Sequence, residues 1–255
     1  MGVPILSLRG ITKSYGAVEA LRGVDLEVFS GEVLALVGDN GAGKSTLVKS
    51  IAGTHQCDAG EIYFDGVETK IQSPGDAVRL GIETLYQDLA LCDNLDVVAN
   101  MFLGRERVGR IRPNAVAPLS ELEMERLALA TLRDLRVTTI RSVRSSIASL
   151  SGGQRQAVAI CRAVLWGSRV VVLDEPTAAL GVAQTRQVLD LISRLRQRGL
   201  AVILISHNLY DVFEVADRIF VLRLGRRAAV LRTSETTPEH VVAEITGAGS
   251  DERMN

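Results

Sequence analysis

The stretch "EVLALVGDNGAGKSTLVKSIAG" (Glu32–Gly53) decides the fold of this chain. An apolar run with the length of a buried strand leads into a glycine-rich turn, and a helical pattern follows. Within it, "GDNGAGKS" (Gly38–Ser45) fits G-x-x-x-x-G-K-[ST], the pattern of a phosphate-binding loop between a strand and a helix. Glycines let backbone N–H groups surround phosphates, Lys44 is placed to reach the β and γ phosphates, and Ser45 offers a hydroxyl to Mg²⁺. The stretch therefore predicts a nucleotide site where the helix begins.

The bulk composition excludes several classes of protein. The chain has 255 residues, 47% of them hydrophobic and 23% charged, with a net charge of −1. This composition is typical of a folded globular protein, and its charge provides no field that would attract nucleic acid, so we expect no nucleic-acid partner. The three cysteines are far apart in the sequence and predict reduced thiols rather than a metal site or a disulfide. The apolar runs are too short for a signal peptide or a membrane span, so work at a membrane would require docking to another protein.

Strand and helix patterns alternate along most of the chain, which predicts an α/β fold with a largely parallel sheet. The expected core strands are Glu32–Gly38, Ile82–Gln87, Arg169–Glu175 and Leu200–Ser206. The alternating pattern of residues 5–28 predicts a small N-terminal antiparallel β-subdomain. Residues 88–164 read as mainly helical. We therefore expect a single domain over residues 1–255, with a core of about 1–87 and 165–247, an inserted helical subdomain and a frayed tail at 248–255.

Several helix ends carry clear sequence signals. Ser120 with Glu123 predicts a capping box at the start of a helix. Ser73-Pro74 and Thr237-Pro238 are typical pairs of an N-cap and a first-turn proline, and Gly199 is a typical helix stop.

Two acidic residues are candidates for the Mg²⁺ ligand and the general base that a phosphate-binding loop does not itself contain. The run "VVVLDE" ends in Asp174 and Glu175, of which the first suits Mg²⁺ and the second suits a general base that activates water. His207 follows the next apolar strand, at the edge where α/β sheets gather their ligand-binding groups.

A second candidate anion site is "LSGGQRQAVAI" (Leu150–Ile160), in which a glycine pair opens an amphipathic helix. Free N–H groups and the helix dipole make such a helix start suitable for phosphate. One chain thus carries two expected phosphate sites, more than a hundred residues apart in the sequence.

Together these motifs resemble the nucleotide-binding subunit of an ATP-binding cassette (ABC) transporter, from about Leu6 to Gly247. The resemblance implies a P-loop NTPase fold of the ABC-cassette type with a RecA-like parallel-sheet core. It also implies that Tyr15 stacks on adenine, that Gln87 senses the γ-phosphate side, and that His207 contacts the γ-phosphate. In that family two cassettes face each other head to tail, so the "LSGGQ" loop of one caps the ATP bound to the other. This arrangement explains the two phosphate sites in each chain.

The resemblance assigns a role to each matching position. The residues implied in catalysis are Lys44, Glu175 and His207, and those implied in Mg²⁺ binding are Ser45, Gln87 and Asp174. The residues implied in ATP binding are Tyr15, Gly38, Asp39, Asn40, Gly41, Ala42, Gly43, Lys44, Ser45, Thr46, Gln87, Ser151, Gly152, Gly153 and Gln154.

One position departs from the family pattern. After "LDEPTA" the family usually carries S-A-L-D, whereas this chain has "AALG", with Gly181 in place of the aspartate. The change leaves the expected ligands in place and affects the residue that helps to join the two ATP sites.

The segments "YQDLALCDNLDVVANMFLGRE" (Tyr86–Glu106), "TAALGV" and "ISHNLYDVFEVADRIFVL" look like ATPases of ribose, xylose and fructose importers. This resemblance implies a second copy of the chain, a membrane permease contacted through about Gln87–Arg112, an indirect link to a sugar-binding protein, and a cytoplasmic position on the inner face of the membrane. The alternatives are a cassette of another transporter class and a soluble ABC ATPase that acts on ribosomes or DNA. Soluble ABC ATPases of this kind usually carry additional coiled arms or basic extensions, and the sequence contains neither pattern.

Overall fold

The computed structural model describes residues 2–109 and 119–248, which form two compact units. Unit 1 comprises residues 1–87, 168–176 and 192–255, and unit 2 comprises residues 88–167 and 177–191. Unit 2 thus includes residues 177–191, which the sequence analysis placed in the core. Residues 110–112 of the predicted permease-contacting segment, and 249–255 of the predicted tail, lie outside the described residues.

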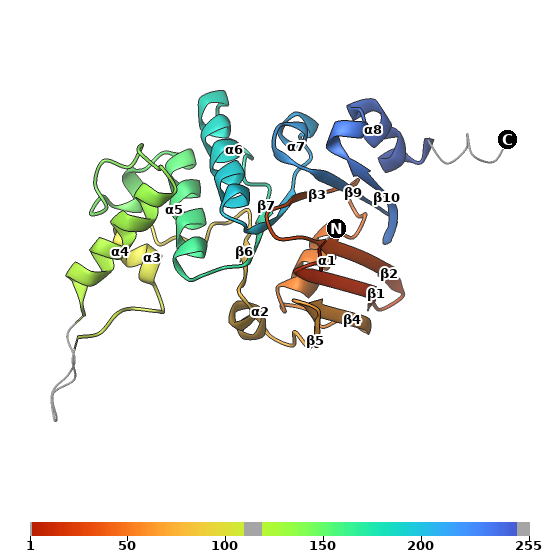
Figure 1. Ribbon diagram of the computed structural model, residues 1–255, viewed down its shortest axis with the longest axis horizontal. Coiled ribbons are helices and arrows are strands. Elements are labelled where there is room, and N and C mark those ends of the chain that lie inside the picture. The colour runs from red at the N-terminus through yellow and green to blue at the C-terminus, as the bar shows by residue number, and fades with distance from the viewer. Residues whose placement is uncertain (1, 110–118, 249–255) are drawn as a thin grey trace. The chain divides into compact units, whose positions relative to one another are not determined.

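Unit 1 contains a six-stranded sheet with the strand order β10-β9-β3-β8-β7-β6 (Figure 1). Neighbouring strands are parallel from β9 to β6, and β10 is antiparallel to β9. The strands are β3 (Val33–Val37), β6 (Ile82–Leu85), β7 (Val170–Asp174), β8 (Ala201–Ile205), β9 (Arg218–Arg223) and β10 (Arg226–Arg232). The four predicted core strands are therefore confirmed, and β9 and β10 are additions that the sequence pattern did not predict.

The register of this sheet brings chemically useful residues to one edge. Leu36 of β3 and Asp174 of β7 both pair with Ile205 of β8. Because the three strands are parallel, the residues after each carboxyl end emerge at the same edge of the sheet. All residues of β3 and β8 are buried, as expected for strands covered on both faces.

The second sheet of unit 1 is antiparallel, with the order β2-β1-β4-β5. Its strands are β1 (Leu6–Tyr15), β2 (Val18–Val28), β4 (Ala59–Phe64) and β5 (Val67–Thr69). The predicted N-terminal antiparallel subdomain is confirmed, and β4 and β5 enlarge it. Buried apolar side chains of this sheet join those of the six-stranded sheet in one hydrophobic core.

The helices of unit 1 are α1 (Lys44–Ile51), α2 (Pro74–Leu80), α7 (Leu209–Val215) and α8 (Pro238–Thr246). Three of them, α1, α2 and α8, begin where the sequence predicted, and α7 had no prediction. Ser73 forms a capping box with Asp76, and the Thr237 side chain accepts a hydrogen bond from the His240 N–H. Both predicted N-caps are therefore confirmed.

Unit 2 is helical, with α3 (Val97–Phe102), α4 (Glu121–Asp134), the short 3₁₀ helix η1 (Ile147–Ser149) and α5 (Gly152–Leu165) (Figure 1). Helix α6 (Val182–Gln197) belongs to this unit as far as Leu191, and Gly199 follows its end with a positive φ of 84°. Helices α3, α4 and α5 pack on one another. Among the described residues, no helix combines the length and the apolar character that a bilayer crossing requires.

The capping box predicted at Ser120 is wrong. Ser120 precedes α4, but its side chain makes no capping hydrogen bond. Its ψ of 68° differs from the extended backbone of Ser73, whose ψ is 159°. Its N–H donates to the carbonyl oxygen of Arg107 at 2.8 Å, so the donor that Glu123 would need is already used.

Candidate nucleotide-binding site

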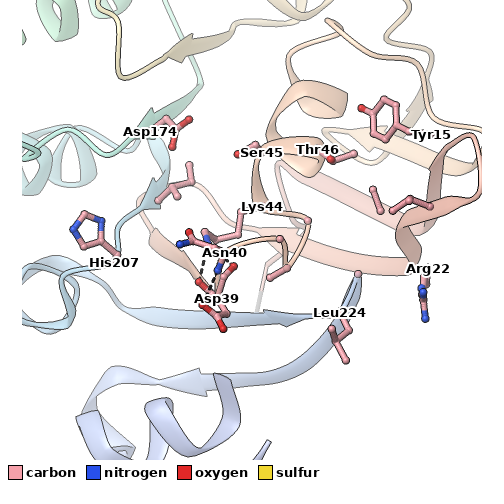
Figure 2. A pocket seen from close by; sticks show the side chains of 18 of the residues that line it. Tyr15, Arg22, Asp39, Asn40, Lys44, Ser45, Thr46, Asp174, His207 and Leu224 are labelled. Carbon is pink, nitrogen blue, oxygen red and sulfur yellow. Dashed lines mark hydrogen bonds between the residues drawn. The ribbon is translucent and has the colours of Figure 1, made fainter. Parts of the chain in front are cut away.

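A pocket of about 980 Å³ lies at the carboxyl ends of the central strands of unit 1 (Figure 2). In Figure 2, Lys44 and Ser45 lie between Asp174 and His207 on one side and Tyr15 on the other. The pocket is lined by all the predicted site residues of unit 1: Tyr15, Gly38, Asp39, Asn40, Gly41, Ala42, Gly43, Lys44, Ser45, Thr46, Gln87, Asp174, Glu175 and His207. Residues far apart in the sequence are therefore brought together in one cavity.

The loop between β3 and α1 is closed around the Lys44 ammonium group. Lys44 Nζ donates hydrogen bonds to the carbonyl oxygens of Gly38 at 2.7 Å and Asp39 at 3.0 Å. The N-cap Gly43 has a φ of 106°, and a Cβ there would lie 2.6 Å from the carbonyl oxygen of Ala20. Only glycine fits this backbone and this approach. The loop thus presents a cation and the first N–H groups of α1 to the cavity, a combination suited to phosphate.

Partial burial shifts the pKa of two charged groups in the pocket. Burial raises the pKa of Asp174, the charge of Glu175 raises it further, and Lys44 and Lys49 oppose the shift. Burial also lowers the pKa of Lys44, whereas Glu175, Asp39 and Asp174 act to raise it. The protein therefore holds adjacent carboxylates close to one ammonium group in a cavity of reduced polarity.

Glu175 is held in an unusual backbone conformation beside His207. Its φ is 51°, which is uncommon for a residue with a side chain, and its N–H donates to the Ile205 carbonyl oxygen at 3.0 Å. The buried Oε2 lies 2.8 Å from Nδ1 of His207, although no donor among the described residues reaches it with hydrogen-bonding geometry. The His207 side chain is 78% exposed. The pair thus places a half-buried carboxylate beside an imidazole that faces the cavity.

The donor set of the pocket fits Mg²⁺. The Ser45 hydroxyl, the Gln87 amide oxygen and the Asp174 carboxylate all line the cavity, and hard cations of this kind prefer oxygen ligands. Burial, and after it the charge of Glu175, raise the pKa of Asp174, so the free protein disfavours the ionised carboxylate, and a divalent cation at this carboxylate would stabilise that form.

Tyr15 ends β1 at the far side of the pocket from His207, as Figure 2 shows. It is 44% exposed, so its ring has free surface on which a base could stack. His55 packs against it with an interplanar angle of 79° and a centroid separation of 5.7 Å, and Lys13 Nζ lies 5.7 Å from the ring centre. The ring is thus supported by neighbours while part of its surface stays accessible.

The turn between β9 and β10 is a part of the pocket that the sequence analysis missed. Leu224 and Gly225 both have positive φ, 50° and 75°, as a two-residue hairpin turn requires. Gly225 donates to the Ala42 carbonyl oxygen at 3.0 Å and accepts from the Arg22 N–H at 2.8 Å, which fixes the turn to the phosphate loop. A leucine in this position gives no turn signal, although the following glycine does.

Ser151, Gly152, Gly153 and Gln154 belong to unit 2, where they start α5. Ser151 and Gln154 form a capping box, in which Ser151 Oγ accepts from the Gln154 N–H and Gln154 Oε1 accepts from the Ser151 N–H. Gln154 Nε2 also donates to the Thr139 carbonyl oxygen at 2.6 Å. The Gln154 amide therefore stabilises the helix start, and its predicted contact with ATP stays a prediction.

Comparison with known proteins identifies the family. The family model described as ABC transporter matches residues 21–178, more than half of the chain. The chain belongs to the ABC transporter family. The fructose import ATP-binding protein of Rhizobium meliloti is 49% identical over 96% of this cassette and 95% of its own length. The xylose/arabinose import ATP-binding protein of Sulfolobus acidocaldarius is 44% identical over 95% of this cassette and 94% of its own length. A ribose import ATP-binding protein of Yersinia pestis is 40% identical, and this cassette covers 48% of its length.

Solved structures confirm the cassette fold. The ADP conformation of an ATP-binding cassette of an ABC transporter has a TM-score of 0.80 at 26% identity and covers 96% of each chain. A dimeric bacterial ABC transporter cassette has a TM-score of 0.72 at 25% identity, over 89% of this chain and 98% of its own.

Proposed function

We propose that this ABC cassette hydrolyses ATP and thereby powers the import of a sugar through a separate membrane permease. The observation that carries the proposal is the pocket of unit 1, which gathers the phosphate loop, Tyr15, Gln87, Asp174, Glu175 and His207 in one cavity. Each group has a chemical counterpart in Mg²⁺-bound ATP: a ring for the base, N–H groups and an ammonium for the phosphates, and oxygens for the cation.

The residues of this chain divide the work of hydrolysis. Lys44 and the N–H groups of the loop bind the β and γ phosphates and stabilise the charge that develops there. Glu175 accepts a proton from the attacking water. The water oxygen forms a bond to the γ-phosphorus, and the bond between this phosphorus and the bridging oxygen of ADP breaks. The His207 imidazole, 2.8 Å from Oε2 of Glu175, would stay beside this carboxylate and donate to the γ-phosphate. A bound Mg²⁺, held by Ser45, Gln87 and Asp174, would neutralise phosphate charge.

The complete ATP site requires a second copy of the chain. Ser151, Gly152 and Gly153 present the N-terminus of the 14-residue helix α5, which suits the γ-phosphate of the ATP bound to the partner. The dimeric cassette among the solved structures supports the pairing of two copies of the chain. Two half-sites in each chain then make two composite sites in each dimer.

The relatives indicate what the cassette drives. Import of fructose and of xylose or arabinose is named for two proteins that match nearly the full length of this chain. We infer that this cassette acts in monosaccharide import, on the cytoplasmic face of a membrane. It would contact the permease through about Gln87–Arg112 and serve a sugar-binding protein indirectly.

The dependence of hydrolysis on protein concentration tests the shared site. We expect the rate per molecule to rise with protein concentration, because each ATP needs groups from two chains. A rate per molecule that stays constant well below micromolar protein would contradict the dimer.

The Glu175→Gln variant tests the proposed base. The amide keeps the shape of the side chain but cannot take up a proton, so we expect turnover to fall by about 10²–10⁴-fold while ATP still binds. Because the bound ATP is not hydrolysed, it should then hold the dimer together during size-exclusion chromatography. Normal turnover in this variant, or a monomer with ATP, would contradict the assignment of Glu175.

A further inference from the structure

Arg155, in the first turn of α5, joins three parts of unit 2 through one guanidinium group. Its Nε donates to the carbonyl oxygen of Leu150 at 3.2 Å, and its Nη2 donates to that of Ala148 at 3.2 Å. Its Nη1 lies 3.1 Å from Oδ1 of Asp93. The first two contacts hold the loop that leads into Ser151–Gly153. The third reaches a residue that is 62 positions earlier in the chain.

Asp93 lies in a segment, residues 92–98, that is bonded along its length to the residues before α5. The Asp93 carbonyl oxygen accepts from Ser146 Oγ at 2.6 Å and from the Ala148 N–H at 3.1 Å. The Ile147 N–H donates to the Leu95 carbonyl oxygen at 3.0 Å. Residues 92–98 and the loop before α5 are therefore connected by backbone bonds as well as by Arg155.

A buried amide makes this segment rigid. Asn100 is fully buried, and its Oδ1 accepts from the Cys92 N–H at 2.7 Å. Its Nδ2 donates to the carbonyl oxygens of Cys92 at 3.0 Å and Asp96 at 2.9 Å. A buried amide that satisfies three backbone groups is costly to displace, so the segment moves as one piece with the start of α3.

We propose that Arg155 is a positioning residue that couples the segment 92–98 to the phosphate-capping residues Ser151–Gly153. The inference rests on the proposed function, in which that segment lies within the permease contact and Ser151–Gly153 bind the ATP of the partner. A displacement of the segment by the permease changes the position of Asp93 and, through the guanidinium, that of the Leu150 carbonyl next to Ser151. Arg155 itself does not touch ATP in this arrangement.

The chemistry of the contact requires arginine. A guanidinium group is planar and has five N–H donors in a fixed arrangement, so it can bond to two carbonyl oxygens and a carboxylate at once. A lysine ammonium keeps the charge opposite Asp93 but cannot span the three acceptors with fixed geometry. Because an exposed ion pair alone contributes little, the bonds to the loop carbonyls carry most of the effect.

The first test measures dimer formation in the Glu175→Gln background, where ATP holds two chains together. Adding Arg155→Met should raise the protein concentration needed for the Mg²⁺–ATP dimer by about tenfold or more, as expected for lost charge-assisted hydrogen bonds. The protein concentration that the Arg155→Lys variant needs for dimer formation should lie between those of the Arg155→Met variant and the parent. Binding of a fluorescent ADP analogue to the monomer should not change, because the P-loop pocket belongs to unit 1. Far-UV circular dichroism equal to that of the parent should show that the helices of unit 2 are still folded, which separates lost positioning from lost folding.

Arg144→Met is the matched control. Arg144 is in the same unit and similarly exposed, 41% against 33% for Arg155, and it pairs with Glu125, Asp96 and Glu121. Among the described residues, Arg144 makes no hydrogen bond to Asp93, Ala148 or Leu150, the three partners of Arg155. The control therefore removes ion pairs, including the one with Asp96 of the segment 92–98, but keeps the bonds of Arg155, and the dimerisation concentration should stay within about twofold of the parent. An equal loss in the two variants would contradict a specific role of Arg155.

The second test asks whether Asp93 acts through Arg155. The measured quantity is the stimulation of ATP hydrolysis by the sugar-loaded binding protein in membranes that contain the permease. Asp93→Asn should reduce this stimulation when it is introduced into the parent. It should have no further effect when it is introduced into the Arg155→Met variant. If the losses of stimulation in the two single variants add up in the double variant, the coupling is overturned. If Glu175→Gln alone forms no dimer with ATP, the proposed function fails and the inference with it. If that dimer forms and Arg155→Met leaves it unchanged, the inference alone is overturned.

Discussion

Asp174 and Glu175 are adjacent carboxylates at the end of a buried strand, and this arrangement is unfavourable for the protein alone. Burial and the charge of Glu175 both raise the pKa of Asp174, and the nearby lysines only partly compensate. Such a site trades stability for the capacity to bind a cation and polyphosphate. His207 lies against Glu175, so the same small region contains the groups that the proposed hydrolysis requires.

Asp174→Asn should therefore stabilise the nucleotide-free protein and abolish turnover. Because the pKa of Asp174 is raised in the folded state, its charged form opposes folding above that pKa, and this penalty disappears as pH falls through it. The melting temperature of the variant should exceed that of the parent near neutral pH, by about 2–4 °C for each 1 kcal/mol removed. The gain should shrink in acid. Scanning calorimetry near neutral pH and in acid measures the difference in melting temperature between the variant and the parent. A variant that melts at a lower temperature than the parent at neutral pH would contradict the raised pKa of Asp174.

Gly181→Asp tests the departure from the family pattern. A Cβ at Gly181 would meet no atom within 4 Å, and its backbone φ is not positive, so the substitution should leave the fold intact. We expect the Hill coefficient of ATP hydrolysis to change more than the affinity for ATP, because this position is predicted to lie between the two sites. A large loss of affinity with an unchanged Hill coefficient would place the residue in a local contact with nucleotide instead.

At the scale of the element, helix starts show which sequence signals become contacts. Ser73 and Ser120 both precede helices and both have an acidic residue three positions later. Only Ser73 caps its helix, because its backbone is extended, whereas the N–H of Ser120 is already bonded to Arg107. Asp76 also accepts from the Gln72 N–H and from Ser73 Oγ, which makes the start of α2 a dense local network.

Ser73→Ala should accordingly destabilise the protein by about 1 kcal/mol, as is typical of a lost N-cap. Ser120→Ala should change the free energy of unfolding by less than about 0.5 kcal/mol, as is usual for a surface substitution. Urea unfolding of the two variants beside the parent measures both values. Equal effects would show that the difference in cap geometry has no energetic consequence.

The sequence patterns predicted what is encoded within a few residues. The strand, loop and helix around Lys44, the caps at Ser73 and Thr237, and the acidic end of β7 all have local signals. Of the strands that were not predicted, β5 and β10 lie at sheet edges, where β5 has only three residues and β10 has three arginines among seven, so alternation does not mark them clearly. Strands β4 and β9 lie inside their sheets, next to β1 and β3, and this pairing with distant segments has no local signal. Contacts between distant segments had no local signal either, as the pairing of Arg155 with Asp93 shows.

At the scale of the whole molecule, one chain carries two features suited to phosphate, one in each unit. The pocket of unit 1 contains Lys44 and its loop, and unit 2 presents Ser151–Gly153 at the start of α5. The proposed dimer uses both features of each chain, with every ATP bound between two copies. A mixed dimer distinguishes this shared arrangement from one in which each chain completes its own site.

The mixed dimer pairs one chain carrying Lys44→Ala with another carrying Gly152→Asp, isolated with different affinity tags. The first change removes the ammonium of the phosphate loop, and the second places a carboxylate where the partner's phosphate is expected. A Cβ at Gly152 would lie 2.9 Å from a terminal methyl of Leu180, which can move aside, so this variant should fold. If sites are shared, both lesions fall in one composite site, and the other site combines an intact P-loop with an intact capping loop.

We therefore expect this mixed dimer to occlude one Mg²⁺–ATP, whereas each homodimeric variant occludes none. Trapping with radiolabelled ATP and rapid gel filtration measures the bound nucleotide, and recovery through both tags shows that the chains are paired. If each chain built its own site, both sites of the mixed dimer would be damaged. A paired dimer with no occluded ATP would thus refute the shared site, and it would leave the glycine pair at the start of α5 without a phosphate to bind.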